Sequence, residues 1–200
     1  ISDCYGVFDG NGKTVRKLLI TSNQDNVGFF STNSNRIINL FFDSCEVRGK
    51  NNSGIVAGNG ATIEKVSVTN STVTGDYLVG GITGFAYGDV KNCIVNNVTI
   101  TAVSVEDQEA LRYPSAGGIA GMALGGVAIT NCSVSGSQIT TGSGDAKSYS
   151  AYSSGILAES GSGTSYGATR VFNCKVNTTT LQAKNYSQTD RSHKPNRDRY

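Results

Sequence analysis

The sequence predicts an all-β protein, a right-handed single-stranded parallel β-helix (β-solenoid) of about six coils with a polar C-terminal tail. Three observations favour this fold. One pattern recurs along most of the chain, apolar residues alternate with polar ones within it, and glycine and asparagine separate the apolar runs. No window shows the i, i+3, i+4, i+7 spacing of an amphipathic helix.

Each repeat contains a strand segment with the order apolar-x-x-apolar-x-apolar. The six segments are TVRKLLITS, RIINLFFDSCEVRG, TIEKVSVTNSTVTG, DVKNCIVNNVTITA, AITNCSVSGSQITT and RVFNCKVNTTTLQA. The first column is Val15, Ile37, Ile63, Val90, Ile129 and Val171; the second is Leu18, Leu40, Val66, Cys93, Cys132 and Cys174; the third is Ile20, Phe42, Val68, Val95, Val134 and Val176. A fourth column holds Val47, Val73, Ile100, Ile139 and Leu181. Short strands with one apolar face bury that face by stacking, so we expect these columns to form a continuous core.

A glycine-led segment precedes each later strand segment, as NVGFFS, NSGIVAG, LVGGITGF, SAGGIAGM and SSGILAE. It supplies a fifth column of Phe29, Ile55, Ile82, Ile119 and Ile156. The second column advances by 22, 26, 27, 39 and 42 residues, so the later units carry insertions, near 103–114 and 142–152. We therefore expect one β-solenoid domain over residues 1–184 and a polar extended tail over 185–200.

Two segments, VGGITGFAYGDVKNCIVNNVTIT and AGGIAGMALGGVAITNCSVSGSQIT, resemble GLUG repeats, the Gly-Leu-any-Gly units of large bacterial and some eukaryotic surface proteins. FDGNGKTVRKLLI followed by NVGFF resembles the coil that opens such arrays. Segments 81–84 and 118–121 carry the motif with Ile for Leu, whereas 28–31, 54–57 and 155–158 lack its last glycine. The resemblance implies a β-solenoid with an adhesive, structural or spacer role, and it implies no catalytic residues.

Composition argues against several function classes. The net charge is +2, from 17 basic and 15 acidic residues among 200, so we expect no binding to nucleic acid or anionic membrane. No apolar run approaches the ~20 residues of a membrane-spanning helix. The chain opens without an initiator Met or a signal peptide, so we expect a mature chain or a fragment.

The segment Gly10-Asn11-Gly12-Lys13-Thr14 comes within one residue of the phosphate-binding motif G-x-x-x-x-G-K-[ST]. The first glycine of that motif would fall at position 7, which is Val7, and the residues after Thr14 have strand character. A phosphate loop needs a helix at that point, so we interpret the segment as the corner that leads into the first strand.

We predict no catalytic residues, no metal and no cofactor. No two carboxylates stack on adjacent coils at the outward positions, so paired acid chemistry is not expected. Cys93, Cys132 and Cys174 share an inward column and are expected to be buried free thiols, and a disulfide between Cys4 and Cys45 stays open. The single histidine, His193, lies in the tail, away from the thiols.

Tyrosines near one predicted corner are candidate contacts for a glycan or a partner, because a tyrosine ring has a large apolar face and a polar tip. They are Tyr77, Tyr113, Tyr149 and Tyr152. A simpler role is to hold the two insertions against the coil. Six N-x-[ST] sequons are candidate N-glycosylation sites, at Asn51, Asn70, Asn97, Asn131, Asn177 and Asn185.

The ends of the predicted solenoid carry no amphipathic capping helix before residue 5 or after residue 183, which leaves strand edges for pairing. We therefore expect a slice of a longer chain, or head-to-tail self-association with the tail laid on the next subunit. Candidate tail contacts are Arg191, Lys194, Arg197, Arg199 and Tyr200. The sequence thus predicts a non-catalytic extracellular or cell-surface protein, structural or adhesive. The alternative is a carbohydrate-binding or polysaccharide-processing β-helix that uses the tyrosine corner.

Overall fold

The computed structural model describes residues 3–104, 113–143, 151–161 and 167–184, and within them the protein is all-β with parallel sheets and no helix. The largest sheet has 12 strands, called here the long sheet. Its strands are β1 (Val7–Arg16), β3 (Phe30–Asp43), β6 (Ala57–Thr69), β9 (Thr83–Ala86), β10 (Val90–Lys91), β11 (Ile94–Asn96), β14 (Ala120–Ala123), β15 (Ala128–Thr130), β16 (Ser133–Ser135), β19 (Leu157–Ser160), β20 (Arg170–Phe172) and β21 (Lys175–Asn177).

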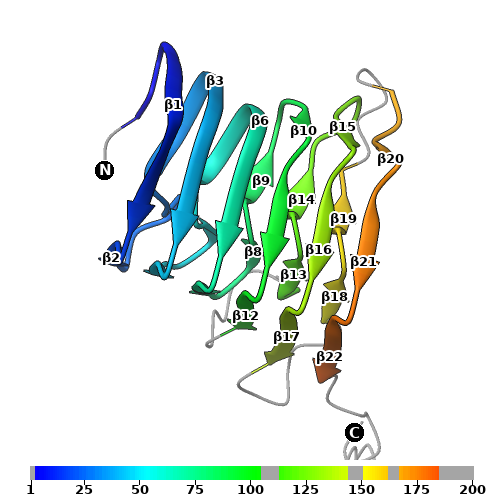
Figure 1. The fold of residues 1–200 in the computed structure, drawn as a ribbon. Coiled ribbons are helices and arrows are strands. Elements are labelled where there is room, and N and C mark those ends of the chain that lie inside the picture. Colours follow the sequence, from blue (N-terminus) through cyan, green and yellow to red (C-terminus); the bar gives the residue numbers. More distant parts are fainter. Residues whose placement is uncertain (1–2, 105–112, 144–150, 162–166, 185–200) are drawn as a thin grey trace, which may run out of the picture.

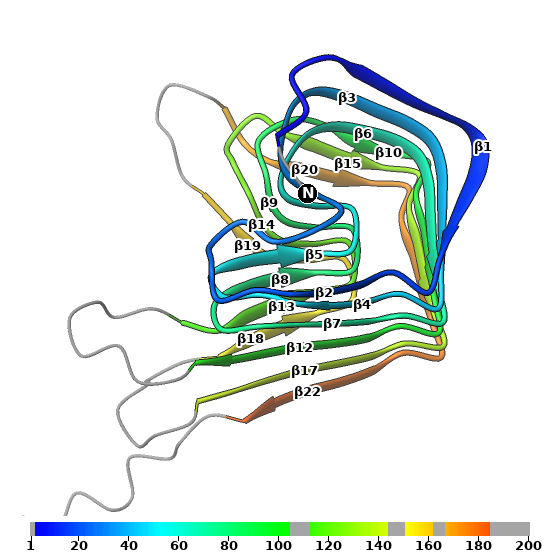
Figure 2. The same ribbon diagram turned by 90° about the vertical axis from the view of Figure 1, so that its left-hand side faces the viewer.

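Two smaller sheets complete each pass of the chain. The six-stranded sheet holds β2 (Leu19–Thr21), β4 (Glu46–Arg48), β7 (Thr72–Gly75), β12 (Thr99–Ser104), β17 (Gln138–Ser143) and β22 (Thr180–Lys184). The four-stranded sheet holds β5 (Asn52–Gly54), β8 (Leu78–Gly80), β13 (Ser115–Gly117) and β18 (Tyr152–Ser154). Successive passes lie side by side from the N-terminal to the C-terminal side in Figure 1, and the view along the stack in Figure 2 shows the strands of each sheet one behind another.

The passes pair in register, so equivalent side chains stack in rows. In the six-stranded sheet, Val47 pairs with Val73, Val73 with Ile100 and Ile100 with Ile139, and all four are fully buried. This confirms the fourth column. The third column is confirmed from Phe42 onward, since its members pair from β3 to β21. Four phenylalanines fill the interior of the first two passes, with ring centroids 4.8–6.3 Å apart: Phe8, Phe29, Phe30 and Phe42.

Two corners in each pass require a left-handed backbone. One, the first corner, is occupied by Asn39, Lys65, Asn92, Asn131 and Asn173, with φ between 51° and 56°. The second corner is occupied by Lys17, Ser44, Asn70, Asn97, Gly136 and Thr178, with φ between 44° and 57°. Asparagine and glycine tolerate this conformation better than other residues, which explains why they punctuate the repeats.

Asparagine side chains at these corners bond to one another along the stack. At the first corner, Asn173 Nδ2 donates to Asn131 Oδ1 at 2.8 Å, and Asn131 Nδ2 donates to Asn92 Oδ1 at 3.2 Å. At the second corner, Asn97 Nδ2 donates to Asn70 Oδ1 at 2.8 Å. Each ladder fixes the register of adjacent passes from outside the core.

The predicted alignment of the first pass is wrong. Phe8, not Val15, pairs with Ile37, whereas Val15 pairs with Phe42 in the third column and Ile20 with Val47 in the fourth. The cause is a shift of register between Asp9 and Lys13, where extra residues bulge out of β1. The spacing of apolar residues in the sequence does not reveal this bulge, because it assigns residues 10–12 to the turn before the strand.

The predicted alignment of the second glycine-led segment is wrong by one residue. Ala57 pairs with Thr83 and Gly54 with Gly80, so Val56, not Ile55, lies beside Ile82. Ile55 therefore lies at the position of Gly81, and Gly58 at the position of Gly84.

That glycine is required by a close backbone approach. A Cβ at Gly121, the equivalent position one pass later, would lie 2.6 Å from the Val79 nitrogen and 2.8 Å from the Gly84 oxygen. At Gly84 the nearest atom would be the backbone nitrogen of Ser53. No side chain fits between the long sheet and the four-stranded sheet here.

The expected boundaries at 184 and 185, and the insertions near 103–114 and 142–152, remain predictions, because residues 105–112, 144–150 and 185–200 lie outside the described part.

Candidate functional site

The Gly10–Thr14 segment does not form a phosphate loop. It lies within β1, which continues as a strand to Arg16 and pairs with β3 on both sides of the bulge. Asn11 and Gly12 both have positive φ, of 48° and 69°. The segment is thus a bulge inside a strand, where we expected a corner before one, and among the described residues no helix N-terminus faces it.

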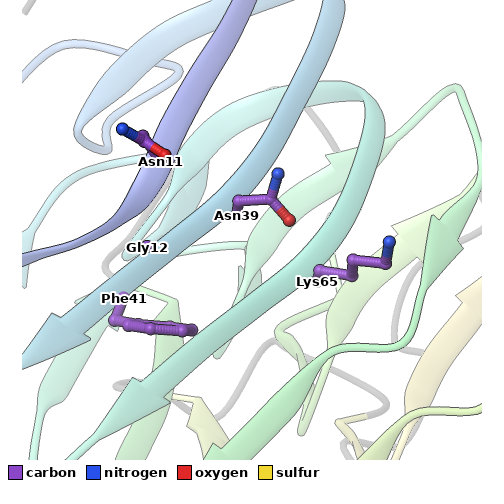
Figure 3. A pocket seen from close by; sticks show the side chains of 5 residues that line it. All are labelled: Asn11, Gly12, Asn39, Phe41 and Lys65. Atoms are coloured by element: carbon purple, nitrogen blue, oxygen red, sulfur yellow. The ribbon is translucent and has the colours of Figure 1, made fainter.

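The bulge forms one wall of a hollow of about 460 Å³, lined by Asn11, Gly12, Asn39, Phe41 and Lys65. Figure 3 shows these residues on three adjacent strands, β1, β3 and β6, with Asn39 between Asn11 and Lys65 and with the Phe41 ring below them. Phe41 keeps 40% of its surface exposed although it lies within β3. The sequence analysis did not identify this site, because neither Phe41 nor Lys65 belongs to an apolar column.

Hydrogen bonds fix the polar groups of this hollow. Asp9 Oδ1 accepts from the Asn11 backbone N–H at 2.8 Å and from Asn39 Nδ2 at 3.1 Å. These two bonds lower the pKa of the Asp9 carboxyl, the Asn11 bond most. The Asn39 amide is therefore held with its oxygen toward the hollow, available to a donor.

The charge on Lys65 is only loosely neutralised. Its Nζ lies 3.8 Å from Glu64 Oε1, but Glu64 also accepts a hydrogen bond from Arg36. The Arg36 bond is the main reason that the pKa of Glu64 is lowered. Arg36, Glu64 and Lys65 together carry one net positive charge at the edge of the hollow.

The tyrosine candidates cluster only in part. The rings of Tyr113 and Tyr152 meet edge to face, 6.1 Å apart, and Tyr152 is 43% exposed. Tyr152 pairs with Ser115, which pairs with Leu78 rather than Tyr77, so Tyr77 occupies a different row and is half-buried. Tyr149 lies outside the described residues.

Four of the sequon asparagines use their side-chain nitrogen inside the fold. Asn51 donates to Asp25 at 2.6 Å, Asn70 donates to Asp43 at 2.9 Å, and Asn97 and Asn131 belong to the ladders. Asn177 is exposed at the end of β21, and its side chain makes no hydrogen bond within the described residues. Asn185 lies outside them, as do the tail candidates Arg191, Lys194, Arg197, Arg199 and Tyr200.

All five cysteines are free. Cys93 and Cys132 are buried in one row and Cys174 is half-buried, so the expected inward thiols are confirmed. Burial raises the pKa of the Cys93 thiol. Cys45 is buried apart from the half-buried Cys4, and no disulfide joins them. In the described part of the chain, no group of three or more His, Cys, Asp or Glu residues could hold a metal ion.

A second hollow, of about 210 Å³, lies at the opposite turn of the first passes and includes Asp25 and Asn26. Nearby, burial raises the pKa of Asp76, and the charge of Asp25 adds to the shift. Asp25 is occupied by the hydrogen bond from Asn51, so its carboxylate stabilises the corner.

Within the described residues, no helix is long and apolar enough to span a membrane. No family model matches the sequence. Over 83 residues the chain is 41% identical to halomucin from Haloquadratum walsbyi, and this match covers 40% of the chain but 1% of halomucin. The chain thus spans about 1% of the length of that relative.

Among solved structures, the fold is similar to that of a Bacteroides ovatus protein proposed to be an immunoglobulin A1 protease. The TM-score is 0.59 at 19% identity, over 89% of this chain and 68% of the other. At that identity the likeness concerns the fold alone. Together with the sheet topology, it places the chain among all-β proteins with stacked parallel strands.

Proposed function

We propose that the chain is a non-catalytic, extracellular structural or adhesive β-solenoid. It would be a right-handed single-stranded parallel β-helix of about six coils, built from GLUG-type repeats. The observation that carries the proposal is the parallel pairing of each described pass with the next, which makes a stack with a largely apolar interior and long outward faces. The similarity to a segment of halomucin, a mucin-like protein by its name, supports an extracellular or cell-surface location.

The last described pass supports growth of the stack by further layers. Val171, Val176 and Leu181 are 43–48% exposed, whereas their partners Ile129, Val134 and Ile139 are fully buried. A further layer of the same kind would cover them. Further repeats of a larger surface protein could supply it, or a second copy could, stacked head to tail with its partner's residues 185–200 laid across the joint.

Electron microscopy and light scattering of the 200-residue chain test this proposal. Concentration-dependent filaments that shorten when residues 185–200 are deleted would favour the self-assembling subunit. A monomeric rod would favour the segment of a larger surface protein and would exclude the filament. Turnover of a polysaccharide or peptide substrate, lost in a single carboxylate variant, would refute the non-catalytic role.

A carbohydrate-binding or polysaccharide-processing β-helix is the second candidate, favoured by the contact between the Tyr113 and Tyr152 rings. The exposed face of a tyrosine ring can stack on a sugar ring. Glycan-array binding that disappears when Tyr77, Tyr113 and Tyr152 are replaced by Ala would support this candidate. Unchanged binding would exclude the tyrosine corner as the site.

A further inference from the structure

We propose that the hollow between β1, β3 and β6 binds a pyranose sugar that carries a carboxylate, through Phe41, Asn39, Asn11 and Lys65. This inference names a ligand class for the adhesive role and rests on that part of the proposed function. It uses a site far from the tyrosine corner, so the two can be tested separately.

Phe41 gives the hollow an aromatic floor. Its strand neighbours are Thr14 on β1 and Ser67 on β6, whose short side chains leave the Phe41 ring 40% exposed. Gly12 adds no side chain above the floor, and the space where its Cβ would stand is open. A sugar ring fits such a shallow platform, because its C–H face stacks on an aromatic face while its hydroxyls remain partly hydrated.

Two side-chain amides are positioned to form hydrogen bonds with sugar hydroxyl groups. Asn39 is oriented by its bond to Asp9, so its oxygen can accept a hydrogen bond. The Asn11 side chain makes no hydrogen bond within the described residues, so its amide can both donate and accept. Figure 3 shows the two amides on adjacent strands above the Phe41 ring. Together they offer the mixed donors and acceptors that a pair of sugar hydroxyls requires.

Lys65 supplies the charge. The first corner holds asparagine in four of its five passes from β3 to β20, and Lys65 takes the remaining place with φ of 54°. Lysine disfavours this conformation relative to asparagine, as also holds for Lys17 at the second corner. The Asn ladder is interrupted here, which leaves the ammonium group to the hollow.

The sign of the field favours an acidic group at the β6 side. Arg36 neutralises Glu64, so Lys65 contributes the net positive charge there. The Asp9 carboxylate lies at the β1 side of the hollow, where it is held by hydrogen bonds from Asn11 and Asn39, and β1 is two strand spacings, about 9–10 Å, from β6. A ligand carboxylate would thus meet Lys65 and avoid Asp9, whereas a cation would meet the opposite arrangement.

Titration calorimetry or chemical-shift titration of the whole chain tests the site with two acidic sugars and their neutral counterparts. The pairs are sialyllactose with lactose, and trigalacturonate with galactotriose. We expect wild-type binding in the millimolar range or tighter, with the acidic member preferred about two- to fivefold at low salt. The preference should vanish at high salt, because the ion pair is exposed.

Matched variants separate the contributions. Phe41→Ala should weaken binding of acidic and neutral sugars about tenfold, the loss expected for an aromatic contact. Lys65→Gln should remove only the preference for the acidic sugar, and Lys65→Arg should restore it. The controls are Ile94→Ala and Lys175→Gln, in the same outward row further along the long sheet, and they should change neither.

The outcomes are exclusive. The site is refuted if wild type binds none of the four sugars up to about 10 mM, or if Phe41→Ala binds as wild type does. Orthophosphate that competes in a Lys65-dependent but Phe41-independent way would reduce it to a plain anion site and overturn the inference. Binding lost only in a Tyr113/Tyr152 variant would refute this site yet leave the adhesive role. Cleavage of a sugar would refute the non-catalytic role and leave the binding site.

Discussion

Replacing Gly121 by Ala tests a close approach between the long sheet and the four-stranded sheet. The new Cβ would lie 2.6 Å from the Val79 nitrogen, whereas ordinary contacts begin at 3.4 Å, so the two strands must separate by roughly 0.8 Å. The obstructing atoms belong to the backbone of β8 and β9 and cannot rotate away. Overpacking of this kind costs ~3 kcal/mol.

The expected effect on thermal unfolding follows from chain length. With an unfolding entropy of ~2.1 cal/mol/K per residue, a loss of ~3 kcal/mol in a chain of 200 residues lowers the melting midpoint by about 7 °C. Circular dichroism would measure it. Hydrogen exchange should accelerate in β8, β13 and β14 and stay unchanged in β1, because each pass contacts mainly its neighbours.

Gly6→Ala is the matched control, since nothing lies within 4 Å of its Cβ position. It should change the free energy of unfolding by less than ~0.5 kcal/mol. A Gly121→Ala protein that melts within about 2 °C of wild type, with unchanged exchange in β8, would show that the backbones are not this close. The close backbone approach inferred for Gly58, Gly84 and Gly121 would then be wrong.

Three further results are expected. Asn131→Ala should lower the free energy of unfolding measured in urea by about 2 kcal/mol, because it removes two ladder hydrogen bonds and places an alanine at a φ of 55°. Asn131→Gly loses the same hydrogen bonds without the backbone strain, so it should cost about half as much. Equal losses in the two variants would show that the backbone is not strained by alanine. Cys93 and Cys132 should react with Ellman's reagent only after unfolding, and fast reaction in the native protein would contradict their burial. Bonds from Asn70 and then Thr69 lower the pKa of Asp43, so its stabilisation is fully present above the unfolded pKa near about 4 and is lost as pH falls through the lower folded value. The melting midpoint of Asp43→Asn should therefore fall less between neutral and acidic pH than that of wild type, and parallel curves would refute this.

The sequence is sufficient to predict the rows of the middle passes but not the register across bulges. Ile55 and Val56 are both fully buried, so a pattern of apolar residues cannot say which of them lies beside Ile82. The pairing of Ala57 with Thr83 decides it, and that pairing depends on the backbone approach at Gly58. Backbone contacts between residues far apart in the sequence produce no repeating residue pattern, so the sequence does not reveal them.

The hollow could not be predicted for a related reason. The core columns are visible because burial restricts them to apolar residues, whereas Phe41 faces outward, where alternation predicts a polar residue. Its exposure depends on Thr14 and Ser67, which are 27 and 26 residues away and become neighbours only through pairing. The sequence alone could therefore show that Phe41 is an aromatic residue at an outward position. It could not show that the residues beside Phe41 have short side chains.

The corners explain how such a protein can carry function without disturbing its core. Each inward side chain packs against the equivalent side chains of the passes before and after it, so a substitution there disturbs both neighbouring passes. A corner side chain points to solvent and is bound only by its backbone conformation and by the ladder. Replacing asparagine by lysine at position 65 removes one rung and adds a charge beside the Phe41 ring, while Leu40 and Val66 stay paired beneath it. The corner rows are therefore where these stacked passes can differ in chemistry while the fold stays the same.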